Sequence, residues 1–156
     1  YDGLGGHNWC DTRNDILAAQ LTDVTFKAGS RCVVSSGTLA DPYTGKTIAW
    51  TKANAAAAQV DHVVPLARAW DLGASTWPMS KRVAFANDER VNLLLVDGPT
   101  NQSKSDQGPA EWMPANKGFA CAYAVRYISV TATYGLNLTD PEKESLDYTI
   151  RQSCAP

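Results

Sequence analysis

The first half of the chain alternates between helical and extended spacing of its apolar residues. In residues 11–21 the apolar side chains are spaced so that they fall on one face of a helix. Asp11 or Thr12 can cap the first turn, so the pattern predicts an amphipathic helix here. Short runs of β-type residues follow, separated by glycines and prolines, at 24–26, 32–34 and 47–50. We expect strands or extended loops in these places.

The middle of the chain predicts two short strands with helices between them. Residues 59–64 form an apolar run that Asp61 and His62 interrupt and Pro65 ends. Alternation along a strand would place Asp61 and His62 on opposite faces unless the strand bends there. The pattern NLLLV at 92–96 predicts a second strand or buried element. Between these two segments, the spacing of the apolar residues predicts helices at 65–72 and 78–87.

The last third of the chain is mainly helical in pattern. The segment 119–134 has helix length, and helix is favoured there despite many β-branched residues. A polar, turn-rich stretch precedes it and has room for a helix at 103–112. Thr139 and Glu142 form a capping-box pattern with an early proline, which predicts a final helix to about Gln152.

Length and composition indicate one globular domain, covering residues 1–156. The 156 residues are 44% hydrophobic and 19% charged, which is typical of a chain with a buried core. No apolar run approaches the roughly 18 residues that a membrane helix needs. We therefore expect a soluble monomer that does not contact a membrane.

Four cysteines lie far apart, with no CxxC pair: Cys10, Cys32, Cys121 and Cys154. They predict two disulfides, and of the three possible pairings we favour the local ones, Cys10–Cys32 and Cys121–Cys154. Each closed loop would add roughly 3 kcal/mol to stability. Four free thiols in a cytosolic protein are the alternative. Disulfides indicate an oxidising compartment, and a start at Tyr1 without a methionine or apolar leader predicts a secreted protein whose signal peptide has been removed.

Asp61 and His62 are unusual polar neighbours inside an apolar run. One explanation is structural: Asp61 accepts backbone N–H bonds in a capped turn, and His62 is a hydrogen-bonded core imidazole. A catalytic explanation needs further residues of matching chemistry elsewhere in the chain. The other histidine, His7, is expected to lie in a surface loop.

Blocks downstream of Asp61 and His62 complete a pattern that resembles the HNH endonuclease superfamily. The stretches VDHVVPLARAWDLGASTW, RVAFANDERVNLLLV and NQSKSDQGPAEWMP, with the earlier CDTRND, are similar to a secreted branch of that superfamily. The resemblance covers residues 10–114 and rests on four separated blocks in one order. It implies an α+β fold with a ββα-metal (HNH) core, an inserted helical segment and extra helices, to which the two expected disulfides are added.

The resemblance also implies a role for each motif residue. Asp61 would bind a divalent metal through its carboxylate, and Asn101 through its amide oxygen, where many relatives have a histidine. Oxygen ligands favour one Mg²⁺ or Mn²⁺ ion over zinc. Asn92 would hold the hairpin loop and orient His62, which would act as the general base.

Phosphodiester hydrolysis needs these residue types. An imidazole with an ordinary pKa near ~6.5 suits the deprotonation of water near neutral pH. A metal held by Asp61 and Asn101 would stabilise the charge that gathers on the phosphate and leaving oxygens, and in-line attack would leave a 5′-phosphate. We expect a secreted endonuclease of DNA, and the sequence leaves open whether RNA is also cut. Because no recognition helix or basic arm is evident, sequence specificity should be low.

Cationic side chains are candidates for phosphate contacts. Lys104 lies about one helical turn beyond Asn101, within reach of a phosphate, although a solvated surface lysine is the alternative. Three arginines are weaker candidates, since helical arginines usually make surface ion pairs: Arg13, Arg68 and Arg90. The formal net charge of −2 predicts weak binding to nucleic acid.

The chain departs from a minimal HNH motif in two ways. The thirty positions from His62 to Asn92 imply that helices are inserted within the hairpin, and an asparagine at 101 predicts lower metal affinity. The residues also allow two other functions. A catalytically inactive, secreted nucleic-acid-binding module on the same fold is disfavoured because all the motif residues are present. A hydrolase that uses His62 with Ser103 is disfavoured because no Gly-x-Ser-x-Gly elbow exists.

Overall fold

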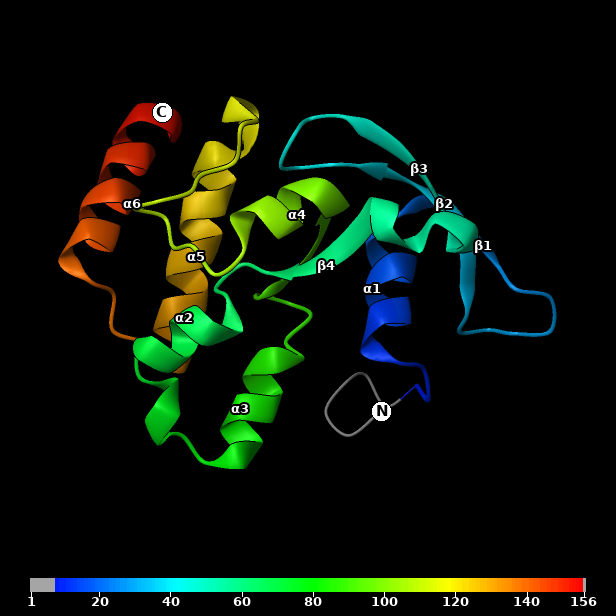
Figure 1. The fold of residues 1–156 in the computed structure, drawn as a ribbon, viewed down its shortest axis with the longest axis horizontal. Coiled ribbons are helices and arrows are strands. Elements are labelled where there is room, and N and C mark those ends of the chain that lie inside the picture. Colours follow the sequence, from blue (N-terminus) through cyan, green and yellow to red (C-terminus); the bar gives the residue numbers. More distant parts are fainter. Residues whose placement is uncertain (1–7, 156) are drawn as a thin grey trace.

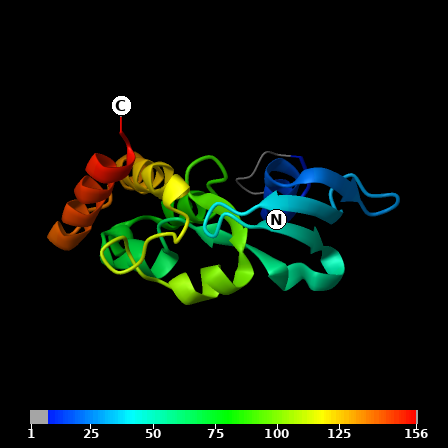
Figure 2. The same ribbon diagram turned by 90° about the horizontal axis from the view of Figure 1, so that it is seen from above.

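The computed structural model describes residues 8–155 (Figure 1). The expectation for His7 and the start of the chain at Tyr1 lie outside the described residues. Strands and helices both contribute substantially, so the predicted α+β class is confirmed. The N-terminal sheet with α1 lies at one end of the molecule and the C-terminal helices lie at the other (Figure 2). The site described below lies on the elements between these two ends.

The N-terminal end combines one helix with a three-stranded antiparallel sheet. Helix α1 (Thr12–Gln20) begins as predicted, because the Asp11 side chain accepts a hydrogen bond from the Asn14 backbone. The sheet has the order β1-β2-β3 and consists of β1 (Thr22–Phe26), β2 (Val34–Ala40) and β3 (Thr47–Thr51). The extended run expected at 32–34 only begins β2, which continues to Ala40. The disulfide Cys10–Cys32 joins the start of α1 to the segment before β2 and confirms the first predicted pairing.

A second, two-stranded sheet forms the middle of the molecule. After the 3₁₀ segment η1 (Lys52–Ala57), β4 (Ala58–His62) pairs antiparallel with β5 (Leu93–Asp97). Between the two strands lie the inserted helices α2 (Leu66–Asp71), η2 (Ala74–Thr76) and α3 (Met79–Ala86). Helix α4 (Gly98–Lys104) follows β5 directly. The order strand, insertion, strand, helix is the ββα arrangement with an inserted helical segment that the sequence predicted.

Helix α4 begins and ends earlier than expected. The resemblance placed its start near Asn101, and 103–112 also had room for a helix. The Asp97 carboxylate instead accepts the Thr100 backbone N–H, which caps the helix three residues earlier, with a proline in the first turn. Ser105 has a positive φ of 52° and ends the helix. The turn-rich segment up to η3 (Lys117–Phe119) contains no helix.

Two antiparallel helices form the C-terminal end. Helix α5 (Ala120–Tyr134) ends at Gly135, which adopts the left-handed conformation common after helices. Helix α6 (Asp140–Ser153) starts with the predicted capping box of Thr139 and Glu142. The disulfide Cys121–Cys154 ties the two helices and confirms the second predicted pairing. Within residues 8–155, every helix is too short or too polar to span a bilayer.

Strand β5 separates two hydrophobic cores. Leu94 and Val96 face the core that α5 and the inserted helices form, whereas Leu93 and Leu95 face the core beneath α1 and the three-stranded sheet. Burial on both faces explains why this strand has an uninterrupted apolar sequence. Its partner β4 lies between α1 and α5 (Figure 1) and therefore also has two different faces.

Candidate active site

Strand β4 presents Asp61 and His62 to different surroundings. In the ladder Asp61 lies opposite Leu94 and His62 lies opposite Leu93, so the two side chains point to different faces, as alternation predicted. Asp61 faces the core that contains Tyr43 and is 5% exposed. His62 is only partly buried, near the end of α3.

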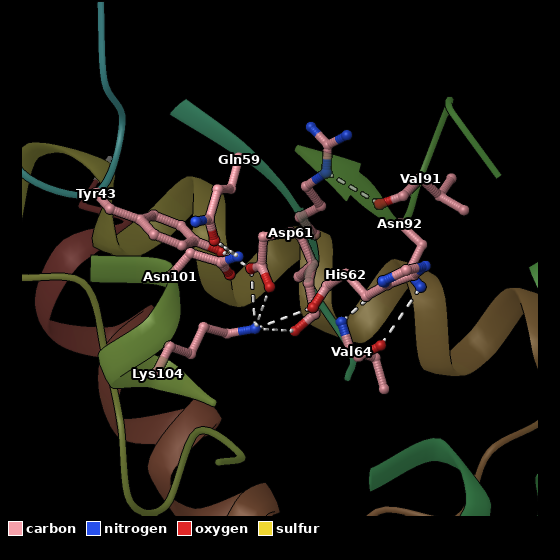
Figure 3. A network of polar contacts seen from close by, with 11 residues as sticks. Tyr43, Gln59, Asp61, His62, Val64, Val91, Asn92, Asn101 and Lys104 are labelled. Atoms are coloured by element: carbon pink, nitrogen blue, oxygen red, sulfur yellow. Dashed lines mark hydrogen bonds and ion pairs between the residues drawn. The ribbon is translucent and has the colours of Figure 1, made fainter. Parts of the chain in front are cut away.

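Asp61 is bound on both carboxylate oxygens by neighbouring side chains (Figure 3). The Lys104 ammonium lies 3.0 Å from Oδ1 and 2.9 Å from Oδ2, and the Tyr43 hydroxyl donates a 2.5 Å hydrogen bond to Oδ2. Charge-assisted bonds of this kind are stronger than neutral ones. The carboxylate is therefore fixed in one orientation by two partners from distant parts of the chain.

Lys104 is fully buried at the end of α4. Besides Asp61, its ammonium donates to the backbone carbonyls of His62 at 2.9 Å and Val63 at 3.2 Å. Burial lowers the pKa of Lys104, and the nearby Asp61 carboxylate opposes that shift. The sequence predicted that Lys104 would contact a phosphate or be a solvated surface lysine. The structure instead places this side chain inside the protein, where it joins α4 to the end of β4.

A close approach of α4 to the chain before β4 makes this contact possible. Gly98 starts α4, and a Cβ at that position would overlap the Ala56 carbonyl oxygen. Tyr43 is placed by a turn in which the Asp41 carboxylate accepts the Thr44 backbone N–H at 2.8 Å and the Asp97 backbone N–H at 2.9 Å. The Asp41 turn thus attaches Tyr43 to the junction of β5 and α4. No pattern near Tyr43 in the sequence indicated a place in the site.

His62 has one ring nitrogen fixed by the inserted helices. Its Nε2 lies 2.8 Å from the carbonyl oxygen of Ala86, the last residue of α3. A carbonyl only accepts, so in the neutral ring the proton belongs on Nε2 and Nδ1 is the acceptor. Burial lowers the pKa of His62, while the bond to Ala86 and the charge of Asp61 act in the opposite direction. The ring is therefore held neutral and oriented near neutral pH.

His62 lines two surface hollows. One, of about 400 Å³, lies toward α1, and the other, of about 340 Å³, lies toward α4, and both are lined by Val60 and His62. Asp61 and Asn101 line the second hollow together with Ser105 and Asp106. His62 and the two predicted metal ligands, Asp61 and Asn101, thus line the second hollow, and we refer to the two hollows together as the depression around His62.

The oxygen atoms around the second hollow suit a hard divalent cation. Asn101 uses its amide nitrogen to donate to Gln59 Oε1 at 3.0 Å, which leaves its amide oxygen as a donor atom for a metal. A carboxylate offers about four lone pairs, and on Asp61 the Lys104 ammonium donates to Oδ1 and the Tyr43 hydroxyl to Oδ2, so a lone pair on Oδ1 remains. Among residues 8–155 no three His, Cys, Asp or Glu side chains gather as a metal site. Two oxygen ligands completed by waters fit Mg²⁺ or Mn²⁺ and do not fit zinc.

Asn92 holds the chain where β4 ends. It is fully buried, and its amide accepts the Val64 backbone N–H at 2.9 Å and donates to the Val64 carbonyl at 3.4 Å. Its own carbonyl accepts the Val63 N–H at 2.8 Å. These bonds hold the loop directly after His62, whereas the hydrogen bond of the His62 ring goes to Ala86 and not to Asn92 as the sequence predicted.

We expect Asn92→Ala to lower the free energy of unfolding by about 1–3 kcal/mol, because the buried Val64 backbone groups lose their partner. Urea denaturation followed by circular dichroism measures the change. Asn137→Ala, at an exposed asparagine, is the control and should stay within about 0.5 kcal/mol of the original chain. Equal stability of the two variants would contradict the role of Asn92.

The three candidate arginines have different positions. Arg13 lines the first hollow and donates from Nη2 to the carbonyls of Ala55 at 3.2 Å and Ala58 at 3.4 Å. Arg68 forms a 2.6 Å ion pair with Glu142, which is 1% exposed. Arg90 is exposed in the loop before β5. Only Arg13 of these three borders the depression around His62, so it remains the best placed for a phosphate.

One further cation, not predicted from the sequence, supports the site from α5. Arg126 donates to the carbonyl of Val91 at 2.9 Å and to that of Leu93 at 3.1 Å, on either side of Asn92. Its place inside a helical apolar pattern gave no functional signal. The contact shows that α5 fixes the start of β5 and so the position of Asn92.

Comparisons with known proteins place the chain in a family. A protein of Arthroderma benhamiae described as an uncharacterized secreted protein is 39% identical over 138 residues, which cover 88% of this chain. This chain spans 65% of that relative's length. No solved structure matches the chain. The family model of the C-terminal domain of GmrSD restriction endonucleases matches residues 11–146, which include every motif residue of the site. The chain therefore belongs to the family of GmrSD restriction endonuclease C-terminal domains.

Proposed function

We propose that this chain is a secreted, metal-dependent endonuclease of the HNH type that hydrolyses phosphodiester bonds of DNA, and also of RNA, with low sequence specificity. The family, which is one of restriction endonuclease domains, supports a nuclease. The observation that carries the proposal is that His62, whose ring is fixed at Nε2, lines one hollow together with Asp61 and Asn101. Secretion is supported by the two disulfides and by the similarity to a protein described as secreted.

His62 is the proposed general base. With the Nε2 proton directed to the Ala86 carbonyl, Nδ1 accepts a proton from the attacking water. Asn92 acts as a positioning residue, since it fixes the backbone directly after His62. Arg13 contributes positive charge for an adjacent phosphate from the α1 side of the depression.

Asp61 and Asn101 would hold one Mg²⁺ or Mn²⁺ ion. When bound, the ion supplies Lewis-acid stabilisation of the charge on the phosphate and leaving oxygens. Tyr43 and Lys104 orient the Asp61 carboxylate, and Gln59 orients the Asn101 amide so that its oxygen is available. We further propose that the enzyme acts as a monomer, because Asp61, His62 and Asn101 already line one hollow without a second copy.

Cleavage assays test the proposal. The protein is incubated with supercoiled plasmid and with RNA, in Mg²⁺, in Mn²⁺ and in EDTA, and products are separated on gels. We expect nicking with either metal, none in EDTA, recovery when excess Mg²⁺ is restored, and 5′-phosphate ends. Nicking that persists in EDTA would contradict the metal. Binding without cleavage under every condition would favour an inactive nucleic-acid-binding module.

A further inference from the structure

The buried ammonium of Lys104 already neutralises the carboxylate that is proposed to bind a metal. Lys104 is fully buried, Asp61 is 5% exposed, and the ammonium contacts both carboxylate oxygens. We propose that Lys104 is an internal counter-ion of the metal site: it keeps Asp61 in place when no metal is bound, and it weakens the binding of a divalent cation. This inference rests on the proposed function, because it concerns the same site.

Burial makes a counter-ion necessary at Asp61. A buried carboxylate without a positive partner is strongly unfavourable, and a hydroxyl donor such as Tyr43 supplies no charge. Apart from Lys104, the structure puts no cationic side chain in contact with Asp61 among residues 8–155. Lys104 is therefore the group that compensates this carboxylate in the absence of metal.

Lys104 is anchored so that it does not leave when a metal arrives. Its ammonium also donates to the carbonyls of His62 and Val63, and these two bonds do not depend on the state of Asp61. One lone pair on Oδ1 of Asp61 stays available, so a cation binds beside the ammonium and does not replace it. Two positive groups on one carboxylate repel each other at short range. The lysine thus lowers metal affinity and at the same time positions the backbone of His62.

Removal of the charge with retention of the side-chain stem tests this inference. Lys104→Met and the original chain are melted in EDTA and in increasing Mn²⁺, and free Mn²⁺ is counted by electron paramagnetic resonance. In EDTA the variant should melt at a lower temperature, because Asp61 is left unpaired. Mn²⁺ should raise its melting temperature by more than that of the original chain, and its Mn²⁺ affinity should be at least about tenfold higher. A purely structural lysine would lower both melting temperatures equally.

Controls separate the possible outcomes. Lys143→Met, at an exposed lysine, should change neither stability nor Mn²⁺ affinity. If Lys104→Met does not fold in EDTA, Lys104→Gln is measured in the same way, and recovery of either variant by Mn²⁺ supports the inference, whereas no recovery overturns it. Equal Mn²⁺ affinity in the original chain and Lys104→Met also overturns it but leaves the proposed metal intact. Absence of Mn²⁺ binding to either protein overturns both.

Discussion

Replacement of His62 by alanine is expected to slow phosphodiester hydrolysis by about 10²–10⁴ fold, which is the usual contribution of general-base assistance. The variant lacks the nitrogen that takes the proton from water, while Asp61, Asn101 and Lys104 keep their own contacts. Initial rates of plasmid nicking in saturating Mg²⁺ measure the loss.

The fold should survive this substitution. The His62 ring makes one hydrogen bond to Ala86, so the expected cost is only about 1 kcal/mol. His7→Ala is the matched control, because it removes the chain's other histidine, and it should retain the original rate. Addition of free imidazole should partly restore the nicking rate of His62→Ala if the lost group is a base. An unchanged nicking rate in His62→Ala would contradict the proposed mechanism.

Local signals in the sequence were sufficient to predict most of the secondary structure. The Asp11 cap and the Thr139 capping box predicted the starts of α1 and α6, because a helix start depends on backbone donors within three residues. The apolar run at 92–96 predicted a second strand or a buried element, and β5 is a strand whose leucines and valine are buried. The two disulfides followed from chain proximity, since each closes a short loop.

Contacts between distant segments could not be predicted in this way. The sequence predicted that Lys104 would contact a phosphate or be a solvated surface lysine, because its burial depends on an acceptor 43 positions earlier in the chain. Tyr43 joins the site only because the Asp41 turn is bound to the end of β5. The resemblance singled out Asp61, His62 and Asn92 as a group, and the structure places them where β4 ends and β5 begins, whereas the contacts of the cation that joins α4 to β4 required the structure.

Asp61→Asn is expected to lower the free energy of unfolding by about 3–5 kcal/mol in EDTA, even though the two side chains have nearly the same shape. The substitution leaves the buried Lys104 ammonium without its counter-charge, and breaking one partner of a buried ion pair typically has an effect of this size. Urea denaturation in EDTA measures it. Asp147→Asn is the matched control, because it breaks an exposed ion pair with Arg151 and should cost no more than about 0.5 kcal/mol.

A double-mutant cycle distinguishes loss of the pair from loss of packing. The variant that combines Asp61→Asn with Lys104→Met contains neither buried charge, so it should be more stable than Asp61→Asn alone. If the two single changes were simply additive, the ammonium and the carboxylate would not be energetically coupled. In that case the 2.9 Å contact between them would contribute packing and no electrostatic stabilisation. Coupling would instead establish that α4 is held to the end of β4 by charge, next to the backbone that carries His62.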